Sequence, residues 1–315
     1  MKIIGTGSVL PKKVVTNDML SEFLDTSDEW IRTRTGVWSR HVISDEKLED
    51  MAIEAAQKAL ADAGMSASDL DYIICSNVVN EFITPQLSCI IQGGIGASCP
   101  CIDINCACAG FIYALEIAES FYKAGRVRNV LIVCAEEPTR MADWTDRRTC
   151  VLFGDGAGAA VLTSGDNIKG FRMSAASATD KLWQFRPLQP TPYICKEEEN
   201  VPLQMKGQDV FKFAVKASSS DISRLLKDCD MKASELDHVL LHQANIRIIN
   251  TIREFMELPE EKFPTNIEDH GNSSSSCCPI LLDECNRKGL LKSGDKIVIS
   301  AFGAGFVSGA VLLEW

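Results

Sequence analysis

The chain has 315 residues, 46% of them hydrophobic, so it can bury a large core in one or two domains. Its formal charge of −11 argues against nucleic-acid binding, which needs a basic surface, and no apolar run is long enough to span a bilayer. The N-terminus is unlike a signal peptide, so we expect a cytoplasmic protein whose thirteen cysteines stay reduced.

The first predicted unit is a helix followed by a buried strand. Residues Lys47–Ala63 show the spacing of an amphipathic helix, and Met65–Ile74, reading MSASDLDYII, lead into the aliphatic run Tyr72–Cys75. A short aliphatic and β-branched run of this kind is typical of a buried strand. We therefore expect this strand to lie in a sheet that helices cover.

The segment Asp103–Ala114, reading DINCACAGFIYA, places Cys108 at the start of a predicted helix. A helix N-terminus carries unpaired N–H groups and about half a positive charge, which stabilises a thiolate and lowers the pKa of a cysteine. Cys108 is therefore a candidate nucleophile, although most free cysteines are small buried hydrophobes and this segment alone does not decide. Cys106 is expected on the same face of the incoming strand, so a second thiol could react or form a disulfide under oxidation.

The pattern of the first unit returns in the second half of the chain. Met231–Leu240, reading MKASELDHVL, follows an amphipathic helix at Val210–Lys227 and leads into the predicted strand His238–Leu241. We interpret this return as one internal duplication. Strands and helices that alternate in this way predict βαβ units with mostly parallel sheets, covered by helices.

Two polar residues of the second half are candidates for the same site as Cys108. His242 follows the predicted strand at its carboxyl end, where ligands of such folds gather. Asn272 stands before a predicted helix closed by Gly289. The number of residues from Asn272 to Gly289 equals the number from Cys108 to Gly125, so Cys108 and Asn272 are expected at equivalent places in the two halves. Singly, His242 could be a buried histidine and Asn272 a turn former, but the three residues converge if the halves pack face to face.

Other segments carry no predicted chemistry. Phe153–Leu162, reading FGDGAGAAVL, lacks the lysine of a phosphate-binding loop, so we expect it to serve packing. No histidine pair has metal-ligand spacing, and the closely spaced cysteines lack the two-residue gap of a zinc knuckle, so no metal site is expected. These cysteines are Cys99 and Cys101, Cys106 and Cys108, and Cys277 and Cys278.

A series of short segments runs in a specific order along nearly the whole chain. They are IIGTGSVLP, SDEWIRTRTG, ACAGF, FGDGAGAAVL, LLHQANIRII, DHGNSSS and AFGAGF. Together they resemble the β-ketoacyl-acyl-carrier-protein synthase III family, condensing enzymes of the thiolase superfamily. The resemblance implies a homodimer and an α/β, thiolase-like, duplicated αβαβα layered fold. Residues 1–165 would form the half that carries Cys108, and residues 166–315 the half that carries His242 and Asn272.

The resemblance also implies a reaction and the residues that perform it. The family condenses a short acyl-coenzyme A, such as acetyl-coenzyme A, with malonyl-acyl-carrier protein, releases carbon dioxide, and so starts fatty acid synthesis. Cys108 is expected to hold the acyl group as a thioester, while His242 and Asn272 donate hydrogen bonds to the enolate left by decarboxylation. His242 must then be neutral, with its proton on Nε2. The backbone N–H groups of Cys108 and Ala304 are expected to form a second oxyanion site.

Coenzyme A brings an adenine ring and phosphates, which an aromatic surface and cations can bind. Trp30 and Arg147 match the family positions that enclose adenine, with Arg148 as an alternative to Arg147, and Arg34 matches a position near the phosphates. Because the acyl-coenzyme A is a substrate, no cofactor is implied. The family segment that meets the acidic carrier protein is matched by Gln243, Ala244, Asn245, Ile246 and Arg247, and Arg253 could extend its basic patch.

The acyl selectivity and the pathway stay open. The family shapes its acyl pocket with residues near Thr84 that reach across the dimer, but this position names no chain length, and the loop Thr179–Asn200 carries no family motif. A related starter-unit condensing enzyme or acyltransferase of secondary metabolism is one alternative. A papain-like cysteine hydrolase is a remote one, because the CGSCW-like context is absent. An inert partner subunit is the non-enzymatic alternative.

Overall fold

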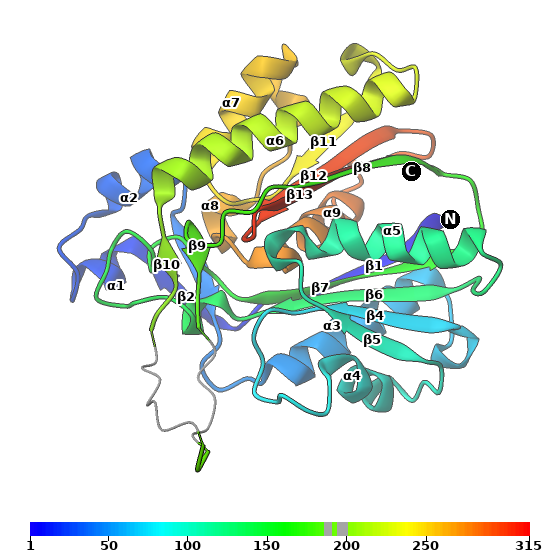
Figure 1. The fold of residues 1–315 in the computed structure, drawn as a ribbon, viewed down its shortest axis with the longest axis horizontal. Helices are drawn as coiled ribbons and strands as arrows, with labels where there is room; N and C mark the ends of the chain where they lie inside the picture. The colour runs from blue at the N-terminus through cyan, green and yellow to red at the C-terminus, as the bar shows by residue number, and fades with distance from the viewer. Residues whose placement is uncertain (186–190, 194–200) are drawn as a thin grey trace.

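The computed structural model describes residues 1–185, 191–193 and 201–315, and two sheets form its centre (Figure 1). The first sheet has the strand order β1 (Lys2–Val9), β7 (Gly156–Thr163), β6 (Val130–Glu136), β4 (Tyr72–Ser76) and β5 (Cys101–Ile104). The second has the order β11 (His238–Leu241), β12 (Lys296–Gly303), β13 (Val307–Glu314) and β8 (Ile168–Ala175). The chain therefore passes from one sheet to the other between β7 and β8.

Helices cover and separate the two sheets, which gives five layers in the order αβαβα (Figure 1). Gly5 and Gly7 of β1 let one outer helix approach closely, since a Cβ on either would lie within 2.5 Å of a helix backbone oxygen. This layered arrangement is the one expected from the sequence. The outer layers are α3 (Leu48–Ala63) with α4 (Leu87–Ile95), and α6 (Gly207–Asp228) with α7 (Ile246–Met256); the middle layer is α5 (Gly110–Lys123) with α9 (Cys277–Arg287).

Smaller elements extend from these layers. Two short antiparallel pairs are formed, one by β2 with β3 and one by β9 with β10. Of the loop Thr179–Asn200, the residues 186–190 and 194–200 lie outside the described part of the chain. The bounds are β2 (Lys13–Thr16), α1 (Asn17–Ser21), α2 (Asp28–Thr35), β3 (Ser39–Val42), β9 (Leu182–Trp183), β10 (Gln204–Met205) and α8 (Ile267–His270).

The expectation of mostly parallel sheets is wrong, because each sheet mixes the two kinds of pairing. β4 is parallel to β5 and β6, and β11 is parallel to β12, whereas the other pairs are antiparallel. β12 and β13 are joined by residues 304–306 alone. A connection this short can join only antiparallel neighbours, since a parallel pair needs a long crossover.

The duplication extends to the turns that begin the two middle helices. Ala107 and Ser274 have positive φ angles of 46° and 57°, and each starts a 3₁₀ turn that leads into α5 or α9. This geometry pairs Cys108 with Ser275 and not with Asn272, so the expected equivalence is wrong. The cause is helix length: α5 has 14 residues and α9 has 11, so counting back from the helix ends misses by about one turn.

The described residues contain neither a group of side chains suited to a metal ion nor a helix long and apolar enough to cross a membrane. Every cysteine among them is a free thiol.

Candidate active site

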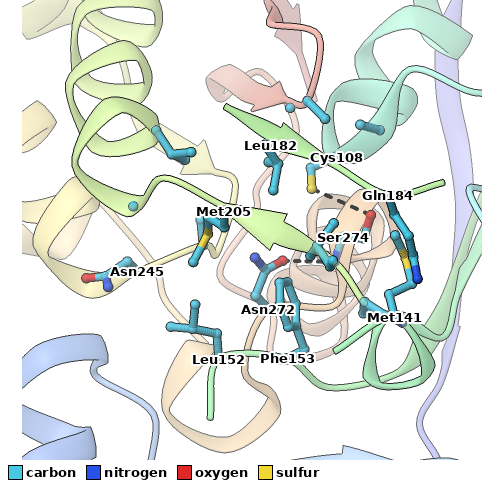
Figure 2. Close-up of a pocket in the computed structure, with 18 of the residues that line it drawn as sticks. Cys108, Met141, Leu152, Phe153, Leu182, Gln184, Met205, Asn245, Asn272 and Ser274 are labelled. Carbon is cyan, nitrogen blue, oxygen red and sulfur yellow. Dashed lines mark hydrogen bonds between the residues drawn. The ribbon is translucent and has the colours of Figure 1, made fainter. Parts of the chain in front are cut away.

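Cys108 lies in the 3₁₀ turn Ala107–Ala109, between β5 and α5. This turn packs tightly on the strands below, because a Cβ on Gly110, the first residue of α5, would lie 1.8 Å from Ser76 Oγ. The Cys108 thiol donates a hydrogen bond to Ser274 Oγ over 3.5 Å, and Figure 2 shows this contact across the site. Cys108, in the first half, therefore touches the turn that begins the middle helix of the second half.

Burial raises the pKa of the Cys108 thiol to about 12, and the nearby Glu136 carboxyl adds to this rise. The lowered pKa expected from a helix N-terminus is therefore wrong in direction. Loss of water disfavours the thiolate, and here it outweighs the hydrogen bond between Cys108 and Ser274, which acts the other way. The thiol is protonated at neutral pH, so its proton must leave when the sulfur attacks a substrate.

Cys108, His242 and Asn272 line one cavity of about 1610 Å³. They come from both halves of the duplication, so the face-to-face convergence expected from the sequence is present. Most of the other expected binding residues are on the same wall: Trp30, Arg34, Arg147, Ala244, Asn245, Arg247 and Ala304.

His242 directly follows β11, and its backbone N–H donates to the Ser300 carbonyl over 2.8 Å. The ring packs edge-on against Phe302, with ring centroids 5.1 Å apart. Its Nδ1 lies 2.7 Å from Sγ of Cys277, the first residue of α9. Its Nε2 has no hydrogen-bond partner within the described ranges, which leaves this nitrogen free for a ligand.

Asn272 is held by the backbone on both sides. Its N–H donates to the Leu152 carbonyl over 2.8 Å, and its carbonyl accepts from the Gly154 N–H over 3.1 Å. Its Oδ1 accepts a hydrogen bond from the Ser274 N–H over 2.9 Å (Figure 2), so the Nδ2 group remains as a donor. The segment Phe153–Leu162, expected to serve packing, therefore also positions Asn272.

The turn after β12 approaches the Cys108 amide. A Cβ on Gly303 would lie 2.8 Å from the Cys108 nitrogen, so this approach requires glycine. β12 ends at Gly303 and β13 begins at Val307, which leaves the N–H of Ala304 outside the strand ladder. The two expected oxyanion donors therefore lie on adjoining turns of the cavity wall.

Trp30 on α2 is flanked by cations. The guanidinium groups of Arg34 and Arg147 lie over its ring, 4.6 and 4.9 Å from the centroid. Arg147 thus lies against the aromatic surface on which adenine was expected to stack, and it is tied there by hydrogen bonds to Asp25. Arg148 instead forms an exposed ion pair, so Arg147 is the partner of Trp30.

The segment expected to meet a carrier protein divides between core and surface. Gln243 has 0% exposure, and its side chain bonds backbone groups on both sides, so it is not available to a partner. Arg247 is exposed, whereas Arg253 is paired with a glutamate over 2.5 Å and adds no free positive charge. Asn245 caps α7 and donates to the Arg34 carbonyl over 3.0 Å. The two remaining residues, Ala244 and Ile246, are partly buried.

Known proteins match this chain along its length. Family models for 3-oxoacyl-[acyl-carrier-protein] synthase III and for its C-terminal part match residues 102–180 and 226–315. The priming β-ketosynthase of the R1128 polyketide pathway has a TM-score of 0.92 at 31% identity, over 99% of this chain and 95% of its own. The 3-oxoacyl-[acyl-carrier-protein] synthase III of Aquifex aeolicus has a TM-score of 0.92 at 41% identity, over 100% and 99%. The β-ketoacyl-[acyl-carrier-protein] synthase III of Clostridium perfringens is 43% identical, over 99% and 98%.

The chain belongs to the 3-oxoacyl-[acyl-carrier-protein] synthase III family. It is accordingly a condensing enzyme of the acyltransferase class with a thiolase-type fold.

The synthase also buries a carboxyl group near Cys108 that the sequence analysis did not single out. Glu136 ends β6 with 2% exposure, and it accepts hydrogen bonds from the Ser275 hydroxyl over 2.5 Å and the Val78 N–H over 3.1 Å. Burial raises its pKa to about 8. The signal was present in the sequence, because an acidic residue that directly continues a buried aliphatic strand is rarely left without partners.

Proposed function

We propose that this synthase condenses a short acyl-coenzyme A, such as acetyl-coenzyme A, with malonyl-acyl-carrier protein. The products are a 3-oxoacyl-acyl-carrier protein, carbon dioxide and coenzyme A, and the reaction initiates fatty acid synthesis. The observation that carries the proposal is the common cavity wall of Cys108, His242 and Asn272, one thiol with two hydrogen-bond donors. Coenzyme A enters as part of a substrate, and neither half-reaction calls for a cofactor.

Acyl transfer takes place at Cys108. The sulfur attacks the thioester carbonyl, an acyl-Cys108 thioester forms, and coenzyme A leaves as its thiol with the proton that Cys108 has lost. The N–H groups of Cys108 and Ala304 then stabilise the negative oxygen of the tetrahedral intermediate. In other enzymes the loss of one such donor slows the reaction by roughly 10²- to 10³-fold.

Decarboxylation of the malonyl group leaves an enolate whose oxygen carries the charge. His242 through Nε2–H and Asn272 through Nδ2–H donate to this oxygen. Because the charge develops only as the transition state forms, both donors increase the rate of decarboxylation. The geometry supports these roles, since Nδ1 of His242 and Oδ1 of Asn272 are already engaged elsewhere. The carbanion then attacks the carbonyl of acyl-Cys108, the bond between this carbonyl and the sulfur breaks, and the Cys108 thiolate regains a proton from solvent.

The substrates are proposed to bind on two surfaces around the cavity. Trp30, with Arg34 and Arg147 over its ring, offers an aromatic face and two cations to the adenine and phosphates of coenzyme A. Arg247 is the exposed cation at the start of α7, and it suits the acidic surface of a carrier protein.

A cytoplasmic homodimer is part of the proposal. The free thiols fit a reducing compartment. β5 is an edge strand that exposes Ile102, and the segment before α4 exposes Phe82 and, to 71%, Ile83. An open strand edge with apolar side chains is a surface on which a second copy can pair. Light scattering should give twice the chain mass of 34.5 kDa, and Ile102→Lys should give a monomer.

The proposal is tested by measuring the two half-reactions separately. His242→Ala and Asn272→Ala are expected to keep thioester formation on Cys108 and to lose carbon dioxide release from malonyl-carrier protein. Cys108→Ser should abolish the acyl-enzyme, whereas Cys106→Ser, on the same cavity wall, should retain it. Loss of acylation with retained decarboxylation in Asn272→Ala would reverse the assigned roles.

The same assays separate the alternatives. An acyltransferase of secondary metabolism that does not decarboxylate would form the acyl-enzyme without releasing carbon dioxide from malonyl-carrier protein. A starter-unit enzyme that does decarboxylate would differ in its preferred acyl group, which mass spectrometry of the protein with a panel of acyl-coenzyme A thioesters reports. An inert subunit would form no adduct at all. Membership of the synthase III family removes the papain-like alternative.

A further inference from the structure

The thiol of Cys277 touches Nδ1 of His242, the ring nitrogen that is not proposed to donate to the enolate. Nδ1 of His242 and Sγ of Cys277 are 2.7 Å apart, and each residue has only 2% exposure. Cys277 lies outside the described wall of the cavity, so it meets substrate only through the histidine. No other side chain in the part of the chain that the structure describes is bonded to this ring.

The direction of this hydrogen bond follows from the groups around the sulfur. Sγ of Cys277 already accepts the backbone N–H of Gln243 over 3.5 Å. Its own proton has two possible acceptors, Nδ1 of His242 at 2.7 Å and Sγ of Cys278 at 3.9 Å. An imidazole nitrogen accepts far better than a thiol sulfur, which is a weak acceptor, and it is also the nearer group. The Cys277 proton therefore points to Nδ1.

The thiol keeps this proton at neutral pH. Burial raises the pKa of Cys277 well above its ordinary value, with Cys278 acting in the same direction. A neutral imidazole that accepts at Nδ1 must carry its own proton on Nε2. This is the nitrogen without a partner among the described residues, and the one that the proposed decarboxylation needs as a donor.

We infer that Cys277 is a positioning residue that holds His242 in its neutral Nε2–H form by donating its thiol proton to Nδ1. The inference rests on the proposed function in one respect: the Nε2–H group is taken to donate to the enolate. Because the ring is oriented before substrate arrives, the donor needs no rearrangement when charge develops on the enolate.

The tautomer is measured by ¹⁵N NMR of histidine-labelled protein. The chain has four histidines, and His242→Ala identifies the signal of His242 by its loss. We expect the Nε2–H form in the wild-type protein. Cys277→Ser keeps a donor and should keep this form, as should the control Cys278→Ala, which changes the neighbouring buried thiol. Cys277→Ala and the apolar, branched Cys277→Val should each give a mixture of tautomers. An Nδ1–H signal in the wild-type protein, or no change in Cys277→Ala and Cys277→Val, would overturn the inference.

The kinetic counterpart is a split between the half-reactions. In Cys277→Ala and Cys277→Val, carbon dioxide release should fall about 10- to 100-fold, the range found when the outer partner of a metal-bound histidine is removed, while acylation of Cys108 is unchanged. Cys277→Ser should restore carbon dioxide release. An equal loss of both steps would indicate a purely structural cysteine and overturn the inference. A wild-type protein that releases no carbon dioxide would instead overturn the proposed function, and the NMR result would still decide the tautomer.

Discussion

Arg147 lies over the ring of Trp30 and is bonded to Asp25 on the neighbouring loop. An adenine ring can stack on that face of Trp30 only when the guanidinium group moves to make room, after which the arginine can stack on the base. A single exposed ion pair is worth at most about 1 kcal/mol, so the bond to Asp25 is weak enough to be exchanged for the ligand. In the structure the arginine covers this face of Trp30, so the proposed stacking of adenine there requires that it move.

Replacement of Trp30 by alanine is expected to raise the KM for acyl-coenzyme A about 10-fold, because stacking of a base on an aromatic ring contributes about 1–3 kcal/mol. The KM for malonyl-carrier protein should stay unchanged. Trp38→Ala is the matched control, since Trp38 lies 4.5 Å from the Arg32 guanidinium and is 50% exposed, but lies outside the cavity wall as described. Steady-state kinetics with each substrate varied in turn checks this. Similar effects on both KM values, or in both variants, would contradict it.

Between elements, a close approach in the site joins the end of β12 to the turn before α5. Besides its clash with the Cys108 nitrogen, a Cβ on Gly303 would lie 2.9 Å from the Ala107 Cβ. Both distances are too short for real contacts, so a side chain here must push the turn away from the strand. That displacement would move one of the two oxyanion donors without removing any polar group.

Gly303→Ala is therefore expected to slow acyl-enzyme formation by roughly 10²- to 10³-fold, as the loss of one oxyanion donor does. Gly93→Ala is the matched control, because Gly93 lies inside α4 and a Cβ added there would have nothing within 4 Å. It should leave the rate unchanged and stabilise the fold by about 0.5–1 kcal/mol. Mass spectrometry of the acyl-enzyme and thermal unfolding of each variant provide the measurements. A Gly303→Ala protein with normal acylation would show that the turn tolerates the methyl group.

In the whole molecule, buried polar contacts join the two halves across the middle layer. Asp283 of α9 accepts hydrogen bonds from the Thr6 and Ser8 hydroxyls of β1, over 2.7 and 2.6 Å. Glu136 of β6 accepts one from Ser275, in the turn before α9. A buried polar group is costly without its partners, so these contacts favour one way of assembling the halves.

Glu136 makes this assembly dependent on pH. Burial raises the pKa of its carboxyl from 4.5 to about 8 in the folded protein. Between these values the folded state holds the proton that the unfolded state has lost, so this group lowers the free energy of unfolding as the pH rises. This loss of unfolding free energy is absent below the pKa that Glu136 has in the unfolded protein. It is complete above the pKa that Glu136 has in the folded protein.

Glu136→Gln removes this titration while keeping one acceptor oxygen. Relative to the wild-type protein, its free energy of unfolding is expected to increase from pH 5 to pH 8, by up to about 1.4 kcal/mol per pH unit. Below pH 5 it should be the less stable protein, because its amide group replaces the oxygen that accepts the Val78 N–H. Urea unfolding at a series of pH values measures the difference. A difference that does not vary with pH would show that Glu136 titrates normally.

Local sequence determined several helices and strands of this protein and the candidates for its site residues. Apolar periodicity located α3, α6, β4 and β11 to within a few residues, because the spacing of buried side chains follows directly from helix and strand geometry. The order of the short segments identified the family, and the resemblance pointed to Cys108, His242 and Asn272, which the structure places on one cavity wall.

Tertiary structure decided the pKa values and hydrogen-bond partners of these residues. Burial reversed the direction expected for the Cys108 pKa, and the contact with Cys277 selects the proton position on His242. The mixed strand directions and the shorter α9 likewise escaped the sequence patterns. The physical reason is common to all four: periodicity and motifs record neighbours along the chain, whereas solvent exclusion, hydrogen-bond partners and strand direction depend on segments that meet only in the folded protein.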